Sequence, residues 1–337
     1  RHPRKDPMKL GVMAALFAGR PLEDVCSHIA DIGLRAIELP VGAWPGRPYF
    51  DPRKVLASRK EQDRIKGLLK AHDLTLSALS VHGNPVHPEK GFARRHHDEF
   101  ATAVELAPKL GTDVVITFSG CPGGSRRDTT PNWVTCPWPG DFSEILKYQW
   151  DTVLVPYWAK QAKFAARHGV RVAWEPHPGF CVYNGETVIR LSELAQRKAG
   201  LRGKPVLGAN LDPSHLFWQG MYPVLVARQL GEAGLLFHVH AKDTELDRHE
   251  GPLNGYLDTK PYGDLKRRAW NFRTCGWGHG TEFWRPFVSM LRRHGYDHVL
   301  SIEHEDAMMS VDEGFERAVA FLQECIVEER PAQAWWF

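Results

Sequence analysis

Four apolar runs in the second half of the sequence each lead into a side chain that can bind a metal or carry a proton. These side chains are Glu175, Asp212, His240 and Glu303. A carboxylate beside a buried strand is costly unless it is paired with a cation or bound to a metal. Two glutamates, one aspartate and one histidine form a hard oxygen and nitrogen ligand set, which suits Mn²⁺, Mg²⁺, Co²⁺ or Zn²⁺. If the strand ends converge, they predict one divalent-metal site.

Other basic and imidazole groups near the same strand ends leave alternatives open. The carboxylates could instead form a ring of salt bridges with basic residues such as Lys242. His238 shares the strand parity of His240, so it either belongs to the site or is a buried histidine with satisfied hydrogen bonds. His82 and His177 also lie at strand ends, and each could contact substrate or hydrogen-bond a neighbouring carboxylate.

The elements that must hold these residues alternate along the chain, with short strand-like runs between longer amphipathic stretches of helical period. The predicted strands are Lys9–Phe17, Ala36–Val41, Thr75–His82, Asp113–Gly120, Arg171–His177, Leu207–Asp212, Leu235–Asp243 and His298–Glu305. The predicted helices are Pro21–Ile32, Arg59–His72, Arg94–Leu110, Glu144–His168, Glu186–Ala199, Tyr222–Leu230, Glu282–His294 and Asp312–Glu328. Because each helix must return the chain across the sheet, the strands are expected to be parallel. One closed (β/α)₈ TIM barrel accommodates all eight without an edge strand.

The main alternative fold is an open doubly wound sheet with a small extra domain. It is disfavoured because no Gly-rich GxGxxG turn follows the first strand. A barrel needs about 250 residues, and the surplus falls in three strand-to-helix loops, Gly42–Arg53, Cys121–Phe142 and Thr244–Thr281. These loops belong to the face where barrel active sites form. We therefore predict a single catalytic barrel over residues 9–328, a disordered leader over residues 1–8 and a Trp-rich tail over residues 329–337.

The composition is that of a globular protein without a specialised charge. Of 337 residues, 43% are hydrophobic and 25% are charged, and the formal net charge is only +3. This balance argues against a dedicated nucleic-acid binder, whose affinity depends on clustered positive charge. No apolar run approaches the roughly 18–20 residues that span a bilayer, and the six cysteines form no CxxC pair. We expect a cytoplasmic protein with reduced thiols and with no nucleic-acid or membrane partner.

On these residues the chain resembles the xylose isomerase-like barrels of the sugar phosphate isomerase/epimerase superfamily. The motifs that carry the resemblance are Glu175, Asp212-Pro213-Ser214-His215, His238-Val239-His240-Ala241-Lys242-Asp243 and Ser301-Ile302-Glu303. The resemblance implies one divalent metal, most often Mn²⁺, held by Glu175, Asp212, His240 and Glu303. It also implies that Glu175 and Glu303 form the catalytic proton-transfer pair. The predicted substrate-binding residues are His82, His177, His215 and Lys242.

The resemblance implies a sugar isomerase or epimerase that acts on a keto-sugar or a derivative. A divalent ion on the carbonyl and adjacent hydroxyl would stabilise the enediolate that forms when a carboxylate removes the α-proton. The sequence departs from free-ketohexose epimerases, because Pro176-His177-Pro178-Gly179 follows Glu175 without their second glutamate and arginine. The stretch Trp270–Gly280 looks similar to a branch that includes the α-subunits of C-glycoside deglycosidases. That similarity implies an alternative, a lyase subunit that enolises and cleaves 3-oxo-glycosides.

Two further classes compete with these readings. The apurinic-site endonucleases belong to the same superfamily, and Asp247-Arg248-His249 is similar to their Asp-x-His metal pair, but Thr117-Phe118-Ser119-Gly120 lacks their strand-four histidine. A noncatalytic barrel that binds a sugar or a partner is disfavoured by the intact four-ligand set. Six of the 12 tryptophans lie in predicted active-face loops, where they either stack on a sugar or an aglycone or form small loop cores. The tail Trp335-Trp336-Phe337 would pack against another subunit, so we expect a homo-oligomer or a hetero-oligomer with a small partner subunit.

Overall fold

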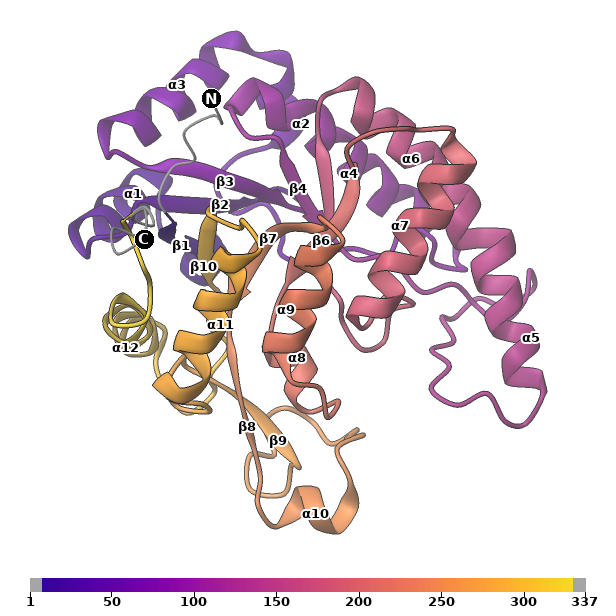
Figure 1. Cartoon of the computed structure of the whole chain (residues 1–337). Helices are drawn as coiled ribbons and strands as arrows, with labels where there is room; N and C mark the ends of the chain where they lie inside the picture. The colour runs from indigo at the N-terminus through magenta and orange to yellow at the C-terminus, as the bar shows by residue number, and fades with distance from the viewer. Residues whose placement is uncertain (1–7, 330–337) are drawn as a thin grey trace, which may run out of the picture.

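Eight parallel strands close into a barrel in the computed structural model, which describes residues 8–329. Around the barrel the strands follow the order β1, β2, β3, β4, β5, β6, β7 and β10, and the last pairs with the first. Their bounds are β1 (Lys9–Met13), β2 (Ala36–Pro40), β3 (Thr75–Ser80), β4 (Val114–Thr117), β5 (Arg171–Trp174), β6 (Leu207–Leu211), β7 (Leu236–Ala241) and β10 (Val299–Ile302). All eight predicted strands are present, and the predicted (β/α)₈ barrel is confirmed (Figure 1).

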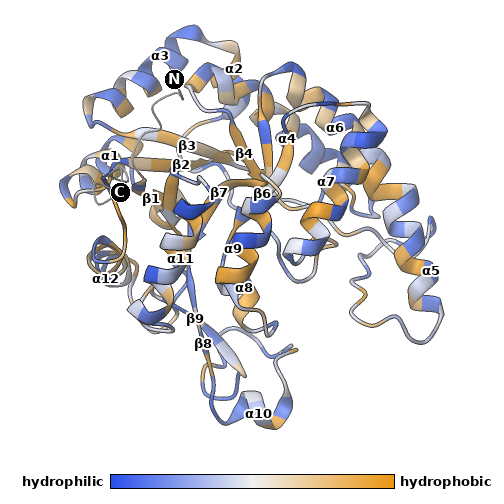
Figure 2. Ribbon diagram, viewed as in Figure 1, coloured by the Kyte–Doolittle hydropathy of each residue, from blue (hydrophilic) through white to orange (hydrophobic). Residues whose placement is uncertain are grey.

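Alternation along the short strands divides their side chains between two faces. Val115 and Trp174 belong to the main apolar core, which also contains the buried faces of the surrounding helices. Val114 and Ile116 point the opposite way and belong to a small separate apolar cluster. Figure 2 shows the helices with hydrophobic and hydrophilic residues alternating along each ribbon, as expected for elements that cover a sheet with one side. The largest part of the core therefore lies between strands and helices.

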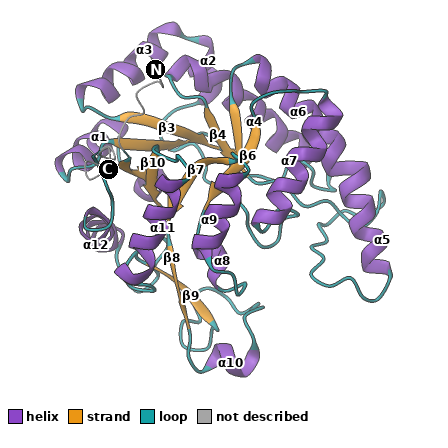
Figure 3. Cartoon of the chain, in the orientation of Figure 1, coloured by secondary structure: helices purple, strands orange, loops and turns teal. Residues whose placement is uncertain are grey.

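Eight principal helices lie outside the strands (Figure 3); seven return the chain from one barrel strand to the next, and the eighth follows the last strand, β10. They are α1 (Leu22–Asp31), α3 (Arg59–Ala71), α4 (Lys90–Leu110), α6 (Val155–Arg167), α7 (Gly185–Ala199), α9 (Pro223–Glu232), α11 (Thr281–Arg293) and α12 (Val311–Gln323). Shorter helical segments lie in the connections that follow strands. They are η1 (Ala14–Phe17), α2 (Pro52–Ala57), α5 (Asp141–Lys147), η2 (Tyr148–Leu154), α8 (Ser214–Phe217) and α10 (Glu250–Asn254).

One predicted helix changes its hydrogen-bonding type along its length in the structure. The sequence predicts a helix over Glu144–His168 that is kinked or bounded near Pro156, whereas the structure has α5, the π-helical segment η2 and then α6. Pro156 lies in the first turn of α6. A proline donates no backbone N–H, so it is accommodated where the hydrogen-bond pattern changes from the π-helical to the α-helical type. The proline thus lies within one continuous helical stretch.

The predicted seventh strand also ends earlier than expected. We predicted a strand over Leu235–Asp243, but β7 ends at Ala241, and Asp243 begins an antiparallel hairpin. The hairpin strands are β8 (Asp243–Leu246) and β9 (Trp270–Arg273). In Figure 1 this hairpin projects from the barrel, with α10 near its far end. The enlarged loop predicted after strand seven therefore contains an ordered hairpin.

The other two enlarged loops also follow strands, β2 and β4. Within residues 8–329, no helix has both the length and the apolar character needed to cross a bilayer. Met8, which we assigned to the leader, is buried in the main core. The predictions for residues 1–7 and for the tail from residue 330 onward lie outside the described residues.

Candidate metal centre

The four side chains predicted to bind a metal come from four neighbouring barrel strands. Glu175, Asp212 and Glu303 each follow the last residue of β5, β6 and β10, and His240 lies near the end of β7. The carboxyl ends of parallel barrel strands meet at one face. One ligand atom from each residue lies within 4.8 Å of those of the other three. The structure therefore brings the whole predicted set together.

The donor atoms of this set fit a divalent cation. His240 Nδ1 lies 3.1 Å from Glu175 Oε2 and 3.3 Å from Glu303 Oε2. Asp212 Oδ2 and His240 Nδ1 are buried, yet neither makes a hydrogen bond of good geometry within residues 8–329. Buried polar atoms normally have a partner, and carboxylate oxygen with imidazole nitrogen is a donor set that hard or borderline divalent ions accept.

The centre has a surplus of negative charge, which favours the binding of a cation. Burial is the largest effect on the pKa of Asp212 and raises it. Lys242 lowers this pKa, whereas repulsion from Glu175 and Glu303 raises it, and the net value is about 6. Burial would also raise the pKa of Glu303, but Lys242 and His240 hold it below its usual range. A carboxyl group with a raised pKa between two ionised carboxylates indicates surplus negative charge, which a divalent ion would offset.

Lys242 forms salt bridges of the kind that the sequence offered as an alternative to a metal site. Its Nζ lies 2.7 Å from Glu303 Oε2 and 3.1 Å from both Asp212 Oδ2 and Glu305 Oε2. Burial alone would lower the pKa of Lys242, but these carboxylates raise it well above its usual value. One ammonium group supplies a single positive charge for three carboxylates, and Glu175 adds a fourth. The lysine and a metal ion are therefore compatible at this centre.

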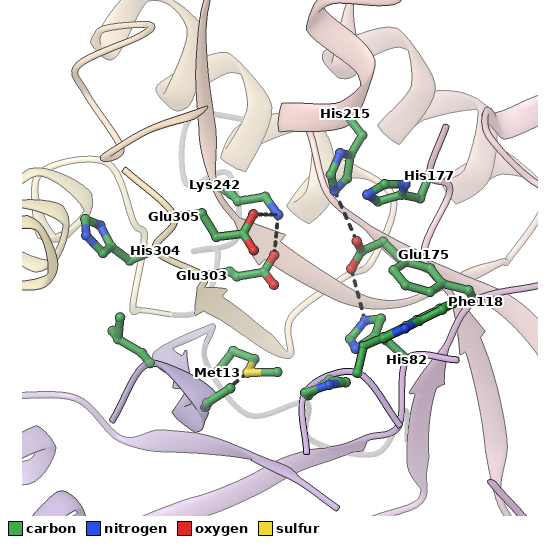
Figure 4. Close-up of a pocket in the computed structure, with 14 residues that line it drawn as sticks. Met13, His82, Phe118, Glu175, His177, His215, Lys242, Glu303, His304 and Glu305 are labelled. Atoms are coloured by element: carbon green, nitrogen blue, oxygen red, sulfur yellow. Dashed lines mark hydrogen bonds and ion pairs between the residues drawn. The ribbon is translucent and has the colours of Figure 1, made fainter. Parts of the chain in front are cut away.

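Three of the histidines predicted to contact substrate surround Glu175 (Figure 4). His82 Nε2 lies 3.2 Å from Glu175 Oε2, and His215 Nε2 lies 3.2 Å from Glu175 Oε1, off the line of a good hydrogen bond. The ring centroids of His177 and His215 are 3.9 Å apart, and His177 donates its Nδ1–H to the carbonyl oxygen of Pro178. Burial lowers the pKa of His215 and lowers that of His177 to about 3. Both rings are thus neutral and can exchange hydrogen bonds with hydroxyl groups.

A cavity of about 330 Å³ opens beside these side chains. Glu175 and Glu303 line it together with Lys242 and the three histidines, whereas Asp212 and His240 are not part of its wall (Figure 4). Its other lining residues are Met13, Ala15, Leu16, Trp44, Pro45, Phe118, His304 and Glu305. Small-molecule pockets usually have volumes of about 300–1,000 Å³, so the cavity suits a compact ligand. All four predicted substrate-binding residues face this one space.

The matching family model covers residues 26–325, and it describes a xylose isomerase-like TIM barrel. The chain belongs to this family. The uncharacterized protein YfiH of Bacillus subtilis (strain 168) is 36% identical over 322 residues, which is 95% of this chain and 99% of YfiH. The family membership that the motifs predicted is therefore confirmed.

Solved structures share the xylose isomerase-like fold at low sequence identity. AsbF from Bacillus anthracis, a probable 3-DHS dehydratase involved in petrobactin synthesis, has a TM-score of 0.63 and 17% identity, covering 94% of this chain and 99% of AsbF. The IolI protein, solved with a bound zinc atom, has a TM-score of 0.62 and 18% identity, covering 94% and 96%. A D-tagatose 3-epimerase-like protein has a TM-score of 0.59 and 19% identity, covering 94% and 98%. At these low sequence identities, the structural similarity shows that the fold is shared.

In this xylose isomerase-like barrel a further acidic residue, Glu38 on β2, reaches the candidate metal centre. Its Oε2 accepts hydrogen bonds of 2.9 Å from His240 Nε2 and from Ser301 Oγ, and its Oε1 accepts one from Ser80 Oγ. Burial would raise the pKa of Glu38, but its contacts with His240 dominate the effects that lower it to about 2. A proton on His240 Nε2 leaves Nδ1 free to face the metal site. Sequence reasoning missed Glu38, although an acidic residue inside the apolar run Ala36–Val41 was a usable signal.

His238 is a buried histidine with satisfied hydrogen bonds. Its Nδ1 lies 2.9 Å from Asn210 Oδ1, and its Nε2 lies 3.2 Å from Ser77 Oγ. Asn210 Nδ2 donates to Glu175 Oε2 at 2.9 Å. Asn210 therefore fixes the orientation of Glu175, and His238 fixes that of Asn210. Sequence reasoning named neither residue as a support, because strand parity shows the face of a side chain but not its partner.

Asp243, which closes the His-x-Lys-Asp motif, organises the loop that follows the hairpin. Its Oδ2 accepts backbone hydrogen bonds from Gly276, Gly278 and His279, at 3.1, 3.2 and 2.8 Å. Its Oδ1 contacts His279 Nδ1 at 2.8 Å, and Trp284 Nε1 donates to Oδ2 at 3.3 Å. A buried carboxylate with so many donors stabilises the connection that leads from the hairpin into α11.

The tryptophans of the active-face loops divide between the two roles considered from the sequence. Trp44 lines the cavity and is 53% exposed, so its ring is accessible to a ligand. Trp218 and Trp270 stack with their ring centroids 4.6 Å apart and their planes 6° from parallel. With Ala269 they form the small core of the hairpin region. One tryptophan is thus placed to contact substrate, and two others stabilise a loop.

Proposed function

We propose that this chain is a divalent-metal-dependent enzyme that isomerises or epimerises a keto-sugar or a sugar derivative. Its membership of a family described as xylose isomerase-like supports this class of reaction, as does the D-tagatose 3-epimerase-like protein of the same fold. The observation that carries the proposal is that Glu175 and Glu303 belong both to the candidate ligand set and to the cavity wall. A substrate in the cavity would meet two carboxylates that come from different strands.

The proposed metal ligands are Glu175, Asp212, His240 and Glu303. We expect Mn²⁺, with Mg²⁺, Co²⁺ and Zn²⁺ as alternatives. The zinc atom in the similar IolI barrel supports a metal site in this fold without selecting the ion. When bound, the divalent ion supplies stabilisation for the negative charge that develops on the carbonyl and hydroxyl oxygens of a sugar.

In this proposal the two glutamates transfer protons. One carboxylate removes the proton from the carbon beside the carbonyl group, which gives an enediolate, and a carboxylate returns a proton afterwards. Return to the same carbon from the opposite face gives an epimer, and return to the neighbouring carbon gives the aldose or ketose isomer. Lys242 holds Glu303, while His82 and Asn210 hold Glu175, so each carboxylate has a fixed position.

The neutral imidazoles of His177 and His215 would bind and orient the sugar hydroxyls. Both rings line the cavity, and both nitrogens of His215 are buried without a well-aligned hydrogen bond within residues 8–329. A neutral imidazole can donate one hydrogen bond and accept another, which matches a hydroxyl group. His82, on the other side of Glu175, would contact the substrate in the same way.

Metal binding and proton exchange test this proposal in one preparation. The chain is stripped with a chelator, reloaded with each of the four ions, and incubated with keto-sugars in D₂O while deuterium incorporation is followed by NMR. We expect exchange that disappears on chelation and that falls by roughly 10²–10⁴-fold in Glu303→Gln. Glu316→Gln, at an exposed position on α12, is the matched control. Exchange that persists without metal, or at full rate in Glu303→Gln, would overturn the proposal.

A second candidate reaction is elimination from a 3-oxo-glycoside. A carboxylate removes the proton from C2, its electrons form the C1=C2 double bond, and the C1–O or C1–C bond to the aglycone breaks while the departing atom gains a proton. The similar fold of AsbF, a probable dehydratase, supports this candidate. So does a second cavity that adjoins the first and could hold a departing group. Exchange with release of aglycone would identify the lyase, and exchange without release would identify the isomerase.

DNA cleavage is the least supported candidate. Asp247, from the stretch similar to a metal pair, accepts backbone hydrogen bonds from His249 and Glu250 on the hairpin. Neither Asp247 nor His249 belongs to a potential metal group among residues 8–329. Phe118 lines the cavity beside β4, where an endonuclease would need a histidine. The expected partners are a sugar or glycoside and another subunit, and no nucleic acid; these stay predictions.

A further inference from the structure

Glu305 lines the candidate active site but does not belong to the proposed set of metal ligands. It lies two residues beyond Glu303, and it also lines the adjoining second cavity. The Glu305 side chain is 49% exposed, whereas the side chains of Glu175 and Glu303 are 3% and 18% exposed. Among the described residues 8–329, Glu305 is thus the most accessible of the three carboxylates in the wall of the first cavity.

The centre carries more negative than positive charge even with a metal ion. Among residues 8–329, Lys242 supplies the one ammonium or guanidinium group in the wall of the first cavity. It contacts Glu303 and Glu305 (Figure 4), and also Asp212. These three carboxylates and Glu175 carry four negative charges when ionised, whereas a divalent ion and Lys242 together supply three positive charges. The metal-loaded centre therefore stays negative.

The imidazoles that line the first cavity do not reverse this balance. Burial lowers the pKa of His177 to about 3, and burial also lowers the pKa of His215 and of His304. These rings are therefore neutral near pH 7. The remaining ring in the wall, His82, lies against Glu175. Even as a cation, His82 would bring the net charge of the loaded centre no higher than zero.

The anion-binding groups that a (β/α)₈ barrel commonly offers are already occupied after β7. In many such barrels a phosphate binds in the loops after strands seven and eight, where a helix begins. In this chain Asp243 accepts the backbone N–H groups of Gly276, Gly278 and His279, which come just before α11. The N–H groups that a phosphate would use are thus bound to a buried carboxylate of the chain.

The loop after β10 repeats this arrangement. Asp306 accepts the backbone N–H of Thr274 at 2.9 Å and that of Met308 at 2.8 Å. Its Oδ2 lies 3.0 Å from Nε of Arg273, and Arg273 also forms an ion pair with Glu245. The guanidinium group therefore has two carboxylate partners of its own. An anionic ligand at this loop would have to displace a carboxylate of the chain.

We propose that Glu305 is a specificity-determining residue, which excludes anionic ligands such as sugar phosphates and sugar acids and so restricts the site to uncharged sugars. This inference rests on the proposed function for the reacting sugar. The effect of Glu305 on anions rests only on its charge and position, because like charges in a partly desolvated space repel each other across several ångströms. Substrate choice and anion repulsion can therefore be tested separately.

Fluorescence quenching measures the access of anions to the first cavity without a reaction. Trp44 lines this cavity and is 53% exposed, and its signal is the difference between a chain and the same chain with Trp44→Phe. In a low-salt buffer with Mg²⁺, we expect Glu305→Gln to raise the quenching constant of Trp44 for iodide by about two- to fivefold. The constant for neutral acrylamide should stay unchanged. The effect on iodide should disappear near about 1 M KCl, where charges are screened.

Two further variants make the quenching result decisive. Glu305→Lys should raise the iodide constant beyond that of Glu305→Gln, because it reverses the charge. Glu316→Gln, at an exposed position on α12, is the matched control and should change neither constant. An iodide constant that is unchanged in both Glu305 variants overturns the role of Glu305. So does a rise in the acrylamide constant that equals the rise for iodide, since it would show that the cavity has merely opened.

Proton exchange in D₂O then tests the choice of substrate. D-fructose and D-tagatose are each compared with their 6-phosphate esters on the metal-loaded chain. We expect kcat/KM for a free sugar to exceed that for its ester by at least about tenfold, and Glu305→Gln to narrow this ratio through a lower KM for the ester. A parent chain that prefers the esters, or a ratio that Glu305→Gln leaves unchanged, overturns the restriction to uncharged sugars. Absence of exchange for all four compounds, with the iodide effect intact, keeps the role of Glu305 and overturns the proposed function.

Discussion

Glu38 Oε2 lies 2.9 Å from His240 Nε2, although β2 and β7 are separated in the barrel by β1 and β10. The contact crosses the barrel interior and directs the Nε2–H of His240 toward Glu38. A carboxylate that orients a ligating imidazole raises its basicity as well as holding its ring. The candidate metal centre thus depends on a strand that contributes none of the four proposed ligands.

The Glu38→Gln variant is expected to bind metal more weakly by about 10–100-fold, the usual effect of losing such a carboxylate. The cause is the loss of the negative charge that orients His240. Competition with a chromophoric chelator gives the dissociation constant of Mn²⁺ for the variant and the parent chain. Glu316→Gln should leave this constant unchanged. An unaltered constant in Glu38→Gln would show that His240 needs no such support.

Replacing Lys242 by methionine is expected to destabilise the metal-free chain by about 3 kcal/mol, because buried Asp212 loses its cation. Saturating Mn²⁺ should recover most of the loss, since the ion supplies the missing positive charge. Thermal unfolding with and without Mn²⁺ measures both effects, and Lys160→Met, on an exposed lysine of α6, is the control. A loss that Mn²⁺ does not recover would favour a purely structural salt-bridge ring.

The Asp243→Ala variant is expected to lower stability by about 3 kcal/mol, because several buried donors lose their acceptor. The metal dissociation constant should stay unchanged, since Asp243 belongs to none of the potential metal groups within residues 8–329. Urea unfolding and chelator competition on the same samples measure the two quantities. Weakened metal binding in a variant of normal stability would assign Asp243 to the centre.

We expect one reactive thiol per native chain with Ellman's reagent near about pH 8, where the thiolate is the reacting form. Cys136 is exposed, and the other five cysteines are buried. Burial, with a smaller effect of Glu23, raises the pKa of Cys26 to about 12, and burial raises that of Cys275 well above its usual value. These two thiols therefore stay protonated at the assay pH. The Cys136→Ser variant should not react until it is unfolded, and rapid reaction of several native thiols would contradict the assignment.

The sequence was sufficient for the barrel and for gathering the four candidate ligands. Both inferences depend on periodicity and on the rule that parallel barrel strands present their carboxyl ends at one face. Glu175, Asp212 and Glu303 stand directly after strands, so their positions follow from strand assignment alone. The same reasoning failed at Asp243, which the pattern placed in β7 but which begins a hairpin.

The supporting contacts could not be predicted because they join residues far apart in the chain. Nothing in the local sequence links Glu38 to His240, or His238 to Ser77, across the barrel. The second cavity is a stronger example, since Tyr262 and Phe272 of the hairpin line it together with His177 of the barrel. Packing of an irregular insertion against a regular barrel is decided by side-chain shape, which periodicity does not encode.

The hairpin insertion can vary separately from the strands that carry the four candidate metal ligands. It leaves the barrel immediately after β7 and rejoins it through Thr274, whose N–H donates to Asp306 at 2.9 Å. Between these fixed ends Ala269 and Trp270 form a small core that is completed by Trp218 from the connection after β6. Mutations inside the insertion can therefore accumulate, and a homologous segment that keeps a partner for Trp218 can replace it, while the eight strands and the candidate metal ligands are preserved.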